Sequence, residues 1–280
     1  MVDATPQTDT RRLLVLLSLG AFLAIDTAAA QQQADTLFQP VVAQPAYAPG
    51  AGPVVLVDEA HHNYHTVEGR YQAFASVLRA DGYVVRPSAR RFDSDVLDEA
   101  DVLVISNALH ERNLDHWQLP TPSAFTPEEI EHVRAWVEHG GSLLLIADHM
   151  PFPGAAQEMG AAFGFAFNNG FAMDTLQPPA DMFYRTDGLL RDHPITNGRT
   201  AAERVDSVRT FTGQAFRAGP EAQPLLVMGP TMVSLMPETA WEFDEGTRRV
   251  AVTGWYQGAV QRFGEGRMAV FGEAAQFTAQ

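Results

Sequence analysis

The sequence lacks two reactive residue types: it has no cysteine, and because all 19 of its basic residues are arginine, it has no lysine. Without cysteine there is no disulfide, no thiolate nucleophile and no Cys-ligated zinc or iron–sulfur site. Without lysine there is no Schiff base and no P-loop lysine, so we expect neither a pyridoxal phosphate nor a nucleotide cofactor. Catalysis or binding is left to Asp, Glu, His, Ser, Thr, Tyr, Asn and Arg.

Positive charge is also scarce. The chain has 34 Asp and Glu residues against 19 Arg, a formal net charge of -15 at pH 7. Because phosphate neutralisation needs a basic face, this balance argues against a nucleic-acid partner. The hydrophobic fraction of 46% is that of an ordinary globular protein, and 280 residues suit one large domain or two small ones.

The N-terminal residues have the pattern of an export signal. A pair of arginines at positions 11 and 12 precedes a short apolar run over residues 13–25, and three alanines follow at 28–30. We therefore expect a cleaved signal peptide over residues 1–30, by the general or the twin-arginine route, and a periplasmic or extracellular protein. The apolar run is too short to serve as a permanent membrane anchor. Residues 31–53, rich in Gln, Ala and Pro, predict a linker or extended arm.

The rest of the chain, residues 54–280, predicts a single α/β domain. Short apolar runs at 54–57, 83–85, 102–105 and 143–146 are typical of strands buried on both faces. Segments with helical periodicity lie between these strands, most clearly after the Thr126-Pro127-Glu128-Glu129 capping box. The alternation predicts a doubly wound, mostly parallel, three-layer sheet of flavodoxin-like type.

The second half is less regular. We expect a helix over 154–163, a long excursion over 166–200, and strands at 208–211, 224–228, 250–253 and 268–271, with a hairpin turn at 264–266 between the last two. Doubly wound domains commonly close with one more helix, so a C-terminal helix is expected to be missing from this sequence.

Polar residues gather where the predicted strands end. In open α/β sheets ligands bind outside the carboxyl ends of the strands. A strand order 2-1-3-4-5 makes the first, third and fourth strands neighbours, so their ends would converge, carrying five of the nine histidines. The residues concerned are Asp58, Glu59, His61, His62, Asn63, His65, Ser106, Asn107, His110, Asp148, His149 and, after the final strand, Glu273.

The functional interpretation of these residues is an acid–base site assisted by one divalent metal, zinc being the first choice. We expect Asp58, His62 and Asp148 to bind the metal. The catalytic groups would be His61, His149 and Glu59, and the ligand-binding residues Asn63, His65, Ser106, Asn107, His110 and Glu273. A metal-free polar pocket, or residues that merely cap helices and tie loops, remain alternatives. Ser106 lacks the Gly-x-Ser-x-Gly elbow of a nucleophile.

Three aromatic residues offer a further alternative. Trp241, Trp255 and Tyr256 could line a sugar-binding face, although aromatics in strands usually belong to the core.

The sequence resembles the class I glutamine amidotransferase-like superfamily in three segments. They are the strand at 54–58 with Glu59-Ala60-His61, the segment 125–148 and the closing segment 266–273. The resemblance is to its exported branch near the trehalose-utilisation-type and gliding-motility transport-associated domains, and it implies the fold described above. The superfamily places a nucleophilic cysteine after a central strand. Here the fourth strand ends in Ala147-Asp148-His149, so glutamine hydrolysis by that mechanism is excluded.

Two functions follow as expectations. The first is an exported hydrolase that uses the Asp/His cluster on an ester, phosphoester or sugar-related substrate. The alternative is a non-catalytic envelope domain that binds a glycan or another small ligand. A purely structural or interaction module is a third possibility, and the sequence does not indicate an oligomeric state.

Overall fold

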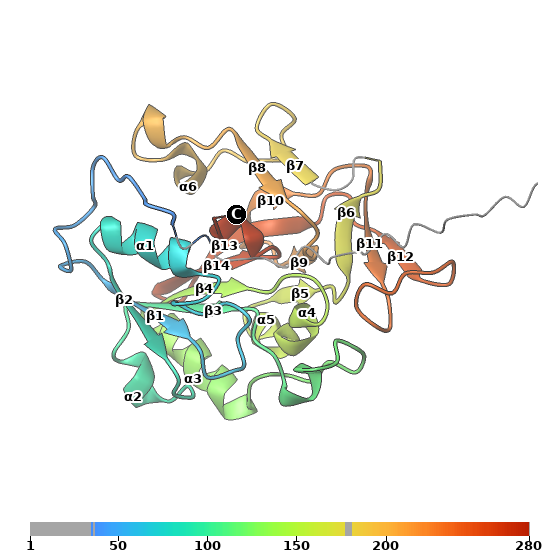
Figure 1. Cartoon of the computed structure of the whole chain (residues 1–280), viewed down its shortest axis with the longest axis horizontal. Helices are drawn as coiled ribbons and strands as arrows, with labels where there is room; N and C mark the ends of the chain where they lie inside the picture. The colour runs from blue at the N-terminus through green and yellow to red at the C-terminus, as the bar shows by residue number, and fades with distance from the viewer. Residues whose placement is uncertain (1–34, 36, 177–180, 280) are drawn as a thin grey trace, which may run out of the picture. The chain divides into compact units, whose positions relative to one another are not determined.

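A nine-stranded mixed sheet organises the described part of the chain, which in this computed structural model is residue 35 and residues 37–176 and 181–279 (Figure 1). The strand order is β2 (Val84–Ser88), β1 (Val54–Asp58), β3 (Val102–Ser106), β4 (Ser142–Ile146), β14 (Gly266–Phe271), β13 (Tyr256–Phe263), β9 (Phe216–Ala218) and β5 (Phe165–Phe167). A further strand, β10 (Gln223–Val227), also pairs with β13.

Only half of this sheet is parallel. The pairings from β2 through β14 are parallel, whereas those of β13 with β14, β10 and β9, and of β9 with β5, are antiparallel. The expected adjacency of the first, third and fourth strands is present. The expectation of a mostly parallel sheet is too simple, because β13, β10, β9 and β5 extend the parallel half through antiparallel pairings.

Helices lie on both sides of the parallel strands in Figure 1, with α1 (Gln72–Ala80) on one side and α2 (Ser94–Leu97) and α3 (Pro127–Glu138) on the other. α3 begins at the predicted capping box: the Thr126 hydroxyl accepts from the Glu129 N–H at 3.3 Å, and the Glu129 carboxylate accepts from the Thr126 N–H at 3.0 Å. The helix predicted over 154–163 is two short helices, α4 (Phe152–Ala155) and α5 (Gln157–Ala161).

The second half of the chain adds two small sheets. One has the order β12 (Arg248–Ala251), β11 (Met232–Met236) and β6 (Phe171–Asp174), and the other pairs β7 (Asp181–Tyr184) with β8 (Ser207–Thr210). A short helix α6 (Pro194–Asn197) and 3-10 turns at Glu111–Asn113, Ala201–Glu203 and Ala275–Phe277 complete the elements. The turn at 264–266 joins β13 to β14, so β13 is the strand that the sequence interpretation missed there.

The three-stranded sheet adjoins the carboxyl ends of β3 and β4. The Met150 N–H donates to the Gly170 carbonyl at 3.1 Å, and the His149 ring stacks on Phe171 of β6 at 4.6 Å. Residues 166–174, expected to be part of an irregular excursion, therefore pack onto the strand ends. This packing buries the His149 ring at the end of β4.

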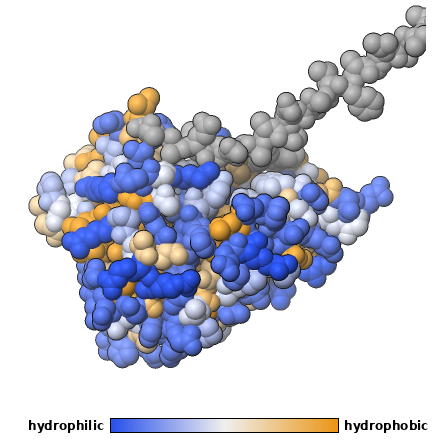
Figure 2. All heavy atoms as spheres, turned by 60° about the horizontal axis from the view of Figure 1, so that its bottom comes forward, coloured by the Kyte–Doolittle hydropathy of each residue, from blue (hydrophilic) through white to orange (hydrophobic). Residues whose placement is uncertain are grey.

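The predicted signal peptide, residues 1–30, lies outside the described residues. Residues 37–53 form neither helix nor strand and are mostly exposed, with the Tyr47 ring edge-on to Tyr83 at 5.1 Å. Within the described residues, no helix is both long and apolar enough to cross a bilayer. Figure 2, which brings forward the face at the bottom of Figure 1, shows a mainly hydrophilic surface with apolar residues in small separate patches.

Candidate functional site

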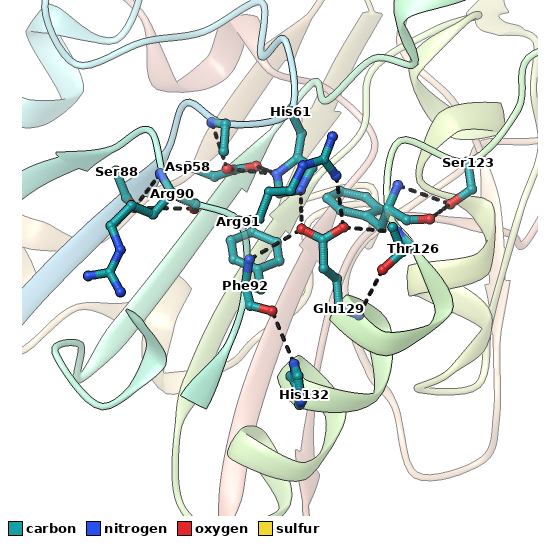
Figure 3. Close-up of polar contacts among 12 residues, drawn as sticks. Asp58, His61, Ser88, Arg90, Arg91, Phe92, Ser123, Thr126, Glu129 and His132 are labelled. Carbon is teal, nitrogen blue, oxygen red and sulfur yellow. Dashed lines mark hydrogen bonds and ion pairs between the residues drawn. The ribbon is translucent and has the colours of Figure 1, made fainter. Parts of the chain in front are cut away.

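His61, at the end of β1, is held between two carboxylates (Figure 3). Its Nδ1 lies 2.9 Å from both carboxylate oxygens of Asp58, and its Nε2 lies 2.9 Å from Oε1 of Glu129 on α3. The ring is fully buried between Phe92 and Phe125, each 4.7 Å away between centroids. With an acceptor at each nitrogen, both nitrogens donate, and the ring is an imidazolium.

The electrostatics agree with this protonation. Burial opposes the charged ring, but the hydrogen bond and charge of Asp58, and then those of Glu129, raise the pKa of His61 above its ordinary 6.5. Burial likewise opposes ionisation of Glu129, yet hydrogen bonds from Thr126, His61 and Phe92 lower its pKa. His61 has no nitrogen left for a substrate, so the geometry does not support the catalytic role expected for it.

The other polar residues that follow β1 form hydrogen bonds around this network and do not create an accessible site. The Asn63 amide donates to Asp58 at 3.0 Å and to the Ser106 carbonyl at 3.2 Å. The Glu59 carboxylate accepts from the Val67 N–H at 2.8 Å, which closes the loop before α1. His62 has a positive φ of 50° and an exposed side chain.

The expected metal ligands do not form one site. Asp58 is occupied by His61 and Asn63, His62 is exposed, and Asp148 belongs to a different cluster described below. Within residues 35, 37–176 and 181–279, no group of three or more His, Asp and Glu side chains is arranged to hold a metal ion. The described residues therefore do not fit the predicted zinc.

A second cluster joins the tips of β3, β4 and β14. Asn107, whose positive φ of 48° is tolerated by asparagine, accepts from the Asp148 N–H at 2.9 Å through its side chain. The buried carboxyls of Asp148 and Glu273 adjoin each other and share a hydrogen bond. Glu273 also accepts from the N–H groups of Phe211 at 3.1 Å and Ala275 at 2.9 Å. The sequence predicts that the ends of the first, third and fourth strands converge, whereas here the ends of β3, β4 and β14 meet and Asp58 of β1 lies in the separate His61 network.

The Asp148–Glu273 pair holds a proton near neutral pH. Burial raises the pKa of Asp148 to about 6, and burial together with the charge of Asp148 raises the pKa of Glu273 to about 8. Ionising both of two carboxyl groups that share a buried site has a high free-energy cost, because the two negative charges repel each other away from water. Because both side chains are almost completely buried, the pair ties the loop at 211–212 to the sheet and offers no open surface to a ligand.

Three other predicted ligand-binding residues contact neighbouring residues of the chain, and two of them, Ser106 and His65, are buried. The buried Ser106 hydroxyl donates to the Tyr71 hydroxyl at 3.0 Å. The His65 ring packs on Tyr71 at 4.5 Å, and burial, with the charges of Arg70 and His149, lowers its pKa to about 3. His110 accepts from the Arg112 N–H at 3.0 Å and so caps a 3-10 turn.

His149 differs from the other histidines. Its Nδ1 donates to the Met150 carbonyl at 2.8 Å, which leaves the lone pair on Nε2, and no other residue of the described chain bonds to that nitrogen. Burial lowers the pKa of His149 to about 4, so the ring is neutral at pH 7. Aromatic rings surround it: Phe171 at 4.6 Å, Trp241 at 4.7 Å, and Trp117 and Phe152 at 5.9 Å.

Two of these rings also line a pocket of about 320 Å³. One wall is the segment Asp115, His116, Trp117 and Gln118, and the other is Thr239, Ala240 and Trp241. The two walls are joined by a β-bridge between Gln118 and Thr239. Trp241 is 49% exposed and has a positive φ of 69°, which a bulky residue rarely adopts.

Sequence reasoning missed most of this pocket. Of the three aromatics that the sequence offers for a sugar-binding face, only Trp241 lines this pocket, whereas Trp255 lies under the Arg217 guanidinium at 4.2 Å and Tyr256 packs against the main core. Nothing in the sequence indicates that Trp117 and His116 contribute to this pocket, because the loop that contains them approaches Trp241 only in the folded structure. Glu129 had a signal in the capping box, but nothing in the sequence linked it to His61.

Comparisons with known proteins support the fold alone. This chain matches no protein family model and no curated protein. Among solved structures it is similar to the N-terminal domain of mmIFT52, with a TM-score of 0.60 and 14% identity over 81% of this chain and 88% of that one. At this identity the likeness carries no functional information.

Two weaker likenesses are to bacterial proteins. One is a putative ThuA-like protein from Bacteroides uniformis, with a TM-score of 0.45, 14% identity and 84% of each chain covered. The other is the exo-β-1,4-mannosidase Op5Man5 from Opitutaceae bacterium strain TAV5, with a TM-score of 0.43 and 13% identity. That match covers 81% of this chain but only 32% of the mannosidase.

Proposed function

We propose that the chain binds a sugar unit of a glycan in the pocket between residues 115–118 and 239–241. The observation that carries this proposal is that Trp117 and Trp241 line one pocket together with four polar side chains, those of Asp115, His116, Gln118 and Thr239. Sugar rings present apolar C–H faces and a rim of hydroxyls. Aromatic rings bind the former, and carboxylate, imidazole and amide groups bind the latter.

The backbone at Trp241 supports the same assignment. A bulky residue with positive φ costs of order 1–3 kcal/mol, and such strain concentrates at ligand sites. The positive φ of Trp241 keeps its large apolar ring half exposed in the lining of the pocket, in contact with the rings of His149 and Phe171. With the signal-like segment over residues 1–30, we place this binding outside the cytoplasm.

Substitution of Trp241 tests the proposal. Trp241→Ala is expected to weaken binding of a responsive disaccharide by about tenfold or more, because a stacking ring of the pocket is lost. Calorimetric titration with cellobiose, maltose and xylobiose measures the affinity. Phe211→Ala is the matched control, since Phe211 is 42% exposed and does not line the pocket. Equal affinities for the two variants, or no saturable binding of any saccharide to the wild type, would contradict the proposal.

Hydrolysis by His149 is the second candidate function. Its neutral ring, with the lone pair on Nε2, has the protonation state of a general base, and it contacts both pocket tryptophans. The residues described above do not fit the metal expected from the sequence, so we propose activation of water by His149 without a metal in this reaction.

A pH profile tests this candidate. Because the pKa of His149 is lowered to about 4, hydrolysis of p-nitrophenyl esters or glycosides should increase as the pH rises through about 4 and level off above it. His149→Gln is expected to abolish turnover, whereas His139→Asn, at the exposed end of α3, should leave it unchanged. Turnover that persists in His149→Gln would reject a catalytic role for this residue.

A further inference from the structure

A second pocket, of about 390 Å³, lies between the segment containing α6 and β8 and the end of β14. Its walls are mostly apolar and include Leu190, Val205, Val208, Leu225, Phe271 and Phe277. This size and composition are typical of pockets for small molecules with an apolar body. At its edge Ile195 is 56% exposed, so a large aliphatic side chain lies in solvent beside an apolar cavity.

Arg209 is the one charged residue in the lining of this pocket. Its guanidinium forms no ion pair with any carboxylate of the described residues, although the chain carries a net charge of -15. Three arginines of the same region are paired, namely Arg185 with Asp192, Arg199 with Glu203, and Arg204 with Asp206. Arg209 thus places a cation without a carboxylate partner among the described residues at the edge of an apolar cavity, where it is available to pair with an anionic ligand.

The strand geometry adds a neutral hydrogen-bonding group. Ser207 and Arg209 are two residues apart on β8, so their side chains leave one face of the strand and that of Val208 leaves the other, and the pocket lies at the edge of β8 where all three reach it. Both line the pocket. A carboxylate bound at this position could accept from the guanidinium and from the hydroxyl together, and such charge-assisted hydrogen bonds are about twice as strong as neutral ones.

From these features we propose that this pocket binds a medium-chain aliphatic carboxylate. The tail lies against the apolar walls, and the carboxylate pairs with Arg209 and Ser207. The site is separate from the tryptophan pocket and shares no lining residue with it, so its occupancy does not depend on the function proposed above.

Calorimetric titration of the full chain with decanoate tests this inference. Arg209→Met is expected to weaken decanoate binding by about tenfold, because the charge-assisted bond is lost while the apolar walls remain. Arg86→Met is the matched control, since Arg86 is also an exposed strand arginine and its loss changes the net charge equally. Ile195→Asp, which places a negative charge at the exposed rim, should weaken binding without disturbing the core.

A neutral probe separates recognition of the head group from adsorption of the tail. 1-Decanol should bind wild type and Arg209→Met equally, and more weakly to the wild type than decanoate does. The inference is overturned if decanoate binds Arg209→Met and Arg86→Met with the same affinity, or if its uptake by the wild type does not saturate. Because disaccharides are not used, failure here leaves the sugar-binding proposal untouched.

Discussion

His61→Ala should lower the free energy of unfolding by about 3–5 kcal/mol, the cost of breaking a buried charge network by removing one partner. The substitution leaves Asp58 and Glu129 facing an empty space between Phe92 and Phe125. Asp58 keeps the Asn63 amide, and Glu129 keeps Arg91 and two backbone N–H groups, but both lose the cation that lies between them.

Urea denaturation followed by circular dichroism measures this effect. His62→Asn is the control, because His62 is the adjacent residue, its side chain is exposed, and asparagine accepts the positive φ at this position. We expect its stability to change by less than about 0.5 kcal/mol. A loss at His61 that is no larger than the loss at His62 would show that the network does not stabilise the fold.

The same network makes the stability of the folded protein depend on pH. Because the pKa of His61 is raised in the fold, its contribution is fully present below the unfolded value of 6.5 and is lost as the pH rises through the folded value. The pKa of Glu129 is lowered, so its contribution is present above 4.5 and is lost as the pH falls through the folded value. The network therefore stabilises the protein most between about pH 4.5 and 6.5.

Asp148→Asn should make the protein more stable in alkaline solution relative to the wild type. In the wild type the folded pKa values of Asp148 and Glu273, about 6 and about 8, exceed the ordinary 3.8 and 4.5. The folded state then binds more protons than the unfolded state, and stability falls as the pH rises from about 4 to about 8. Asparagine removes one buried charge but keeps an oxygen for the His149 N–H and a donor for Glu273.

Between pH 5 and pH 8.5, we expect the stability difference to shift in favour of Asp148→Asn by about 2–4 kcal/mol. Urea denaturation at both pH values measures the shift. Glu265→Gln serves as the comparison, because Glu265 is an exposed acid in the β13–β14 turn and its replacement should leave the pH dependence unaltered. A parallel pH dependence of Asp148→Asn and the wild type would mean that the two carboxyls are not coupled.

Local patterns in the sequence were sufficient to predict the parallel half of the sheet. The apolar runs of β1, β3 and β4 each read as a strand buried on both faces, and the capping box fixed the start of α3 at Pro127. The predicted adjacency of β3 and β4 also brings the Asn107 side chain to the Asp148 N–H, whereas Glu273 joins them because β14 pairs with β4. These predictions depend on short-range rules, so they needed no knowledge of the remaining chain.

The antiparallel half and the accessibility of the site could not be predicted in this way. Strand β6 is too short to show the alternation of apolar and polar residues that marks a strand. Its Phe171 packs against His149 and Trp241, and these contacts join segments that are distant in the sequence. The sequence could place His61 at a strand tip, but only the fold shows that Glu129 approaches it from α3. Whether a tip histidine faces solvent or a second carboxylate is decided by tertiary packing.

The position of β14 between β4 and β13 has a consequence for the synthesis of the chain. Arg267 pairs with Ser142, so the inner edge of β4 has no hydrogen-bonding partner until residues 266–271 have left the ribosome. An unpaired strand edge of this kind is prone to association with other chains. Because such distant pairing is also slow to form, the strands β2, β1, β3 and β4, complete by residue 146, wait for residues 266–271 before the sheet is extended beyond β4. A chaperone thus has an extended period in which to bind the open edge of β4.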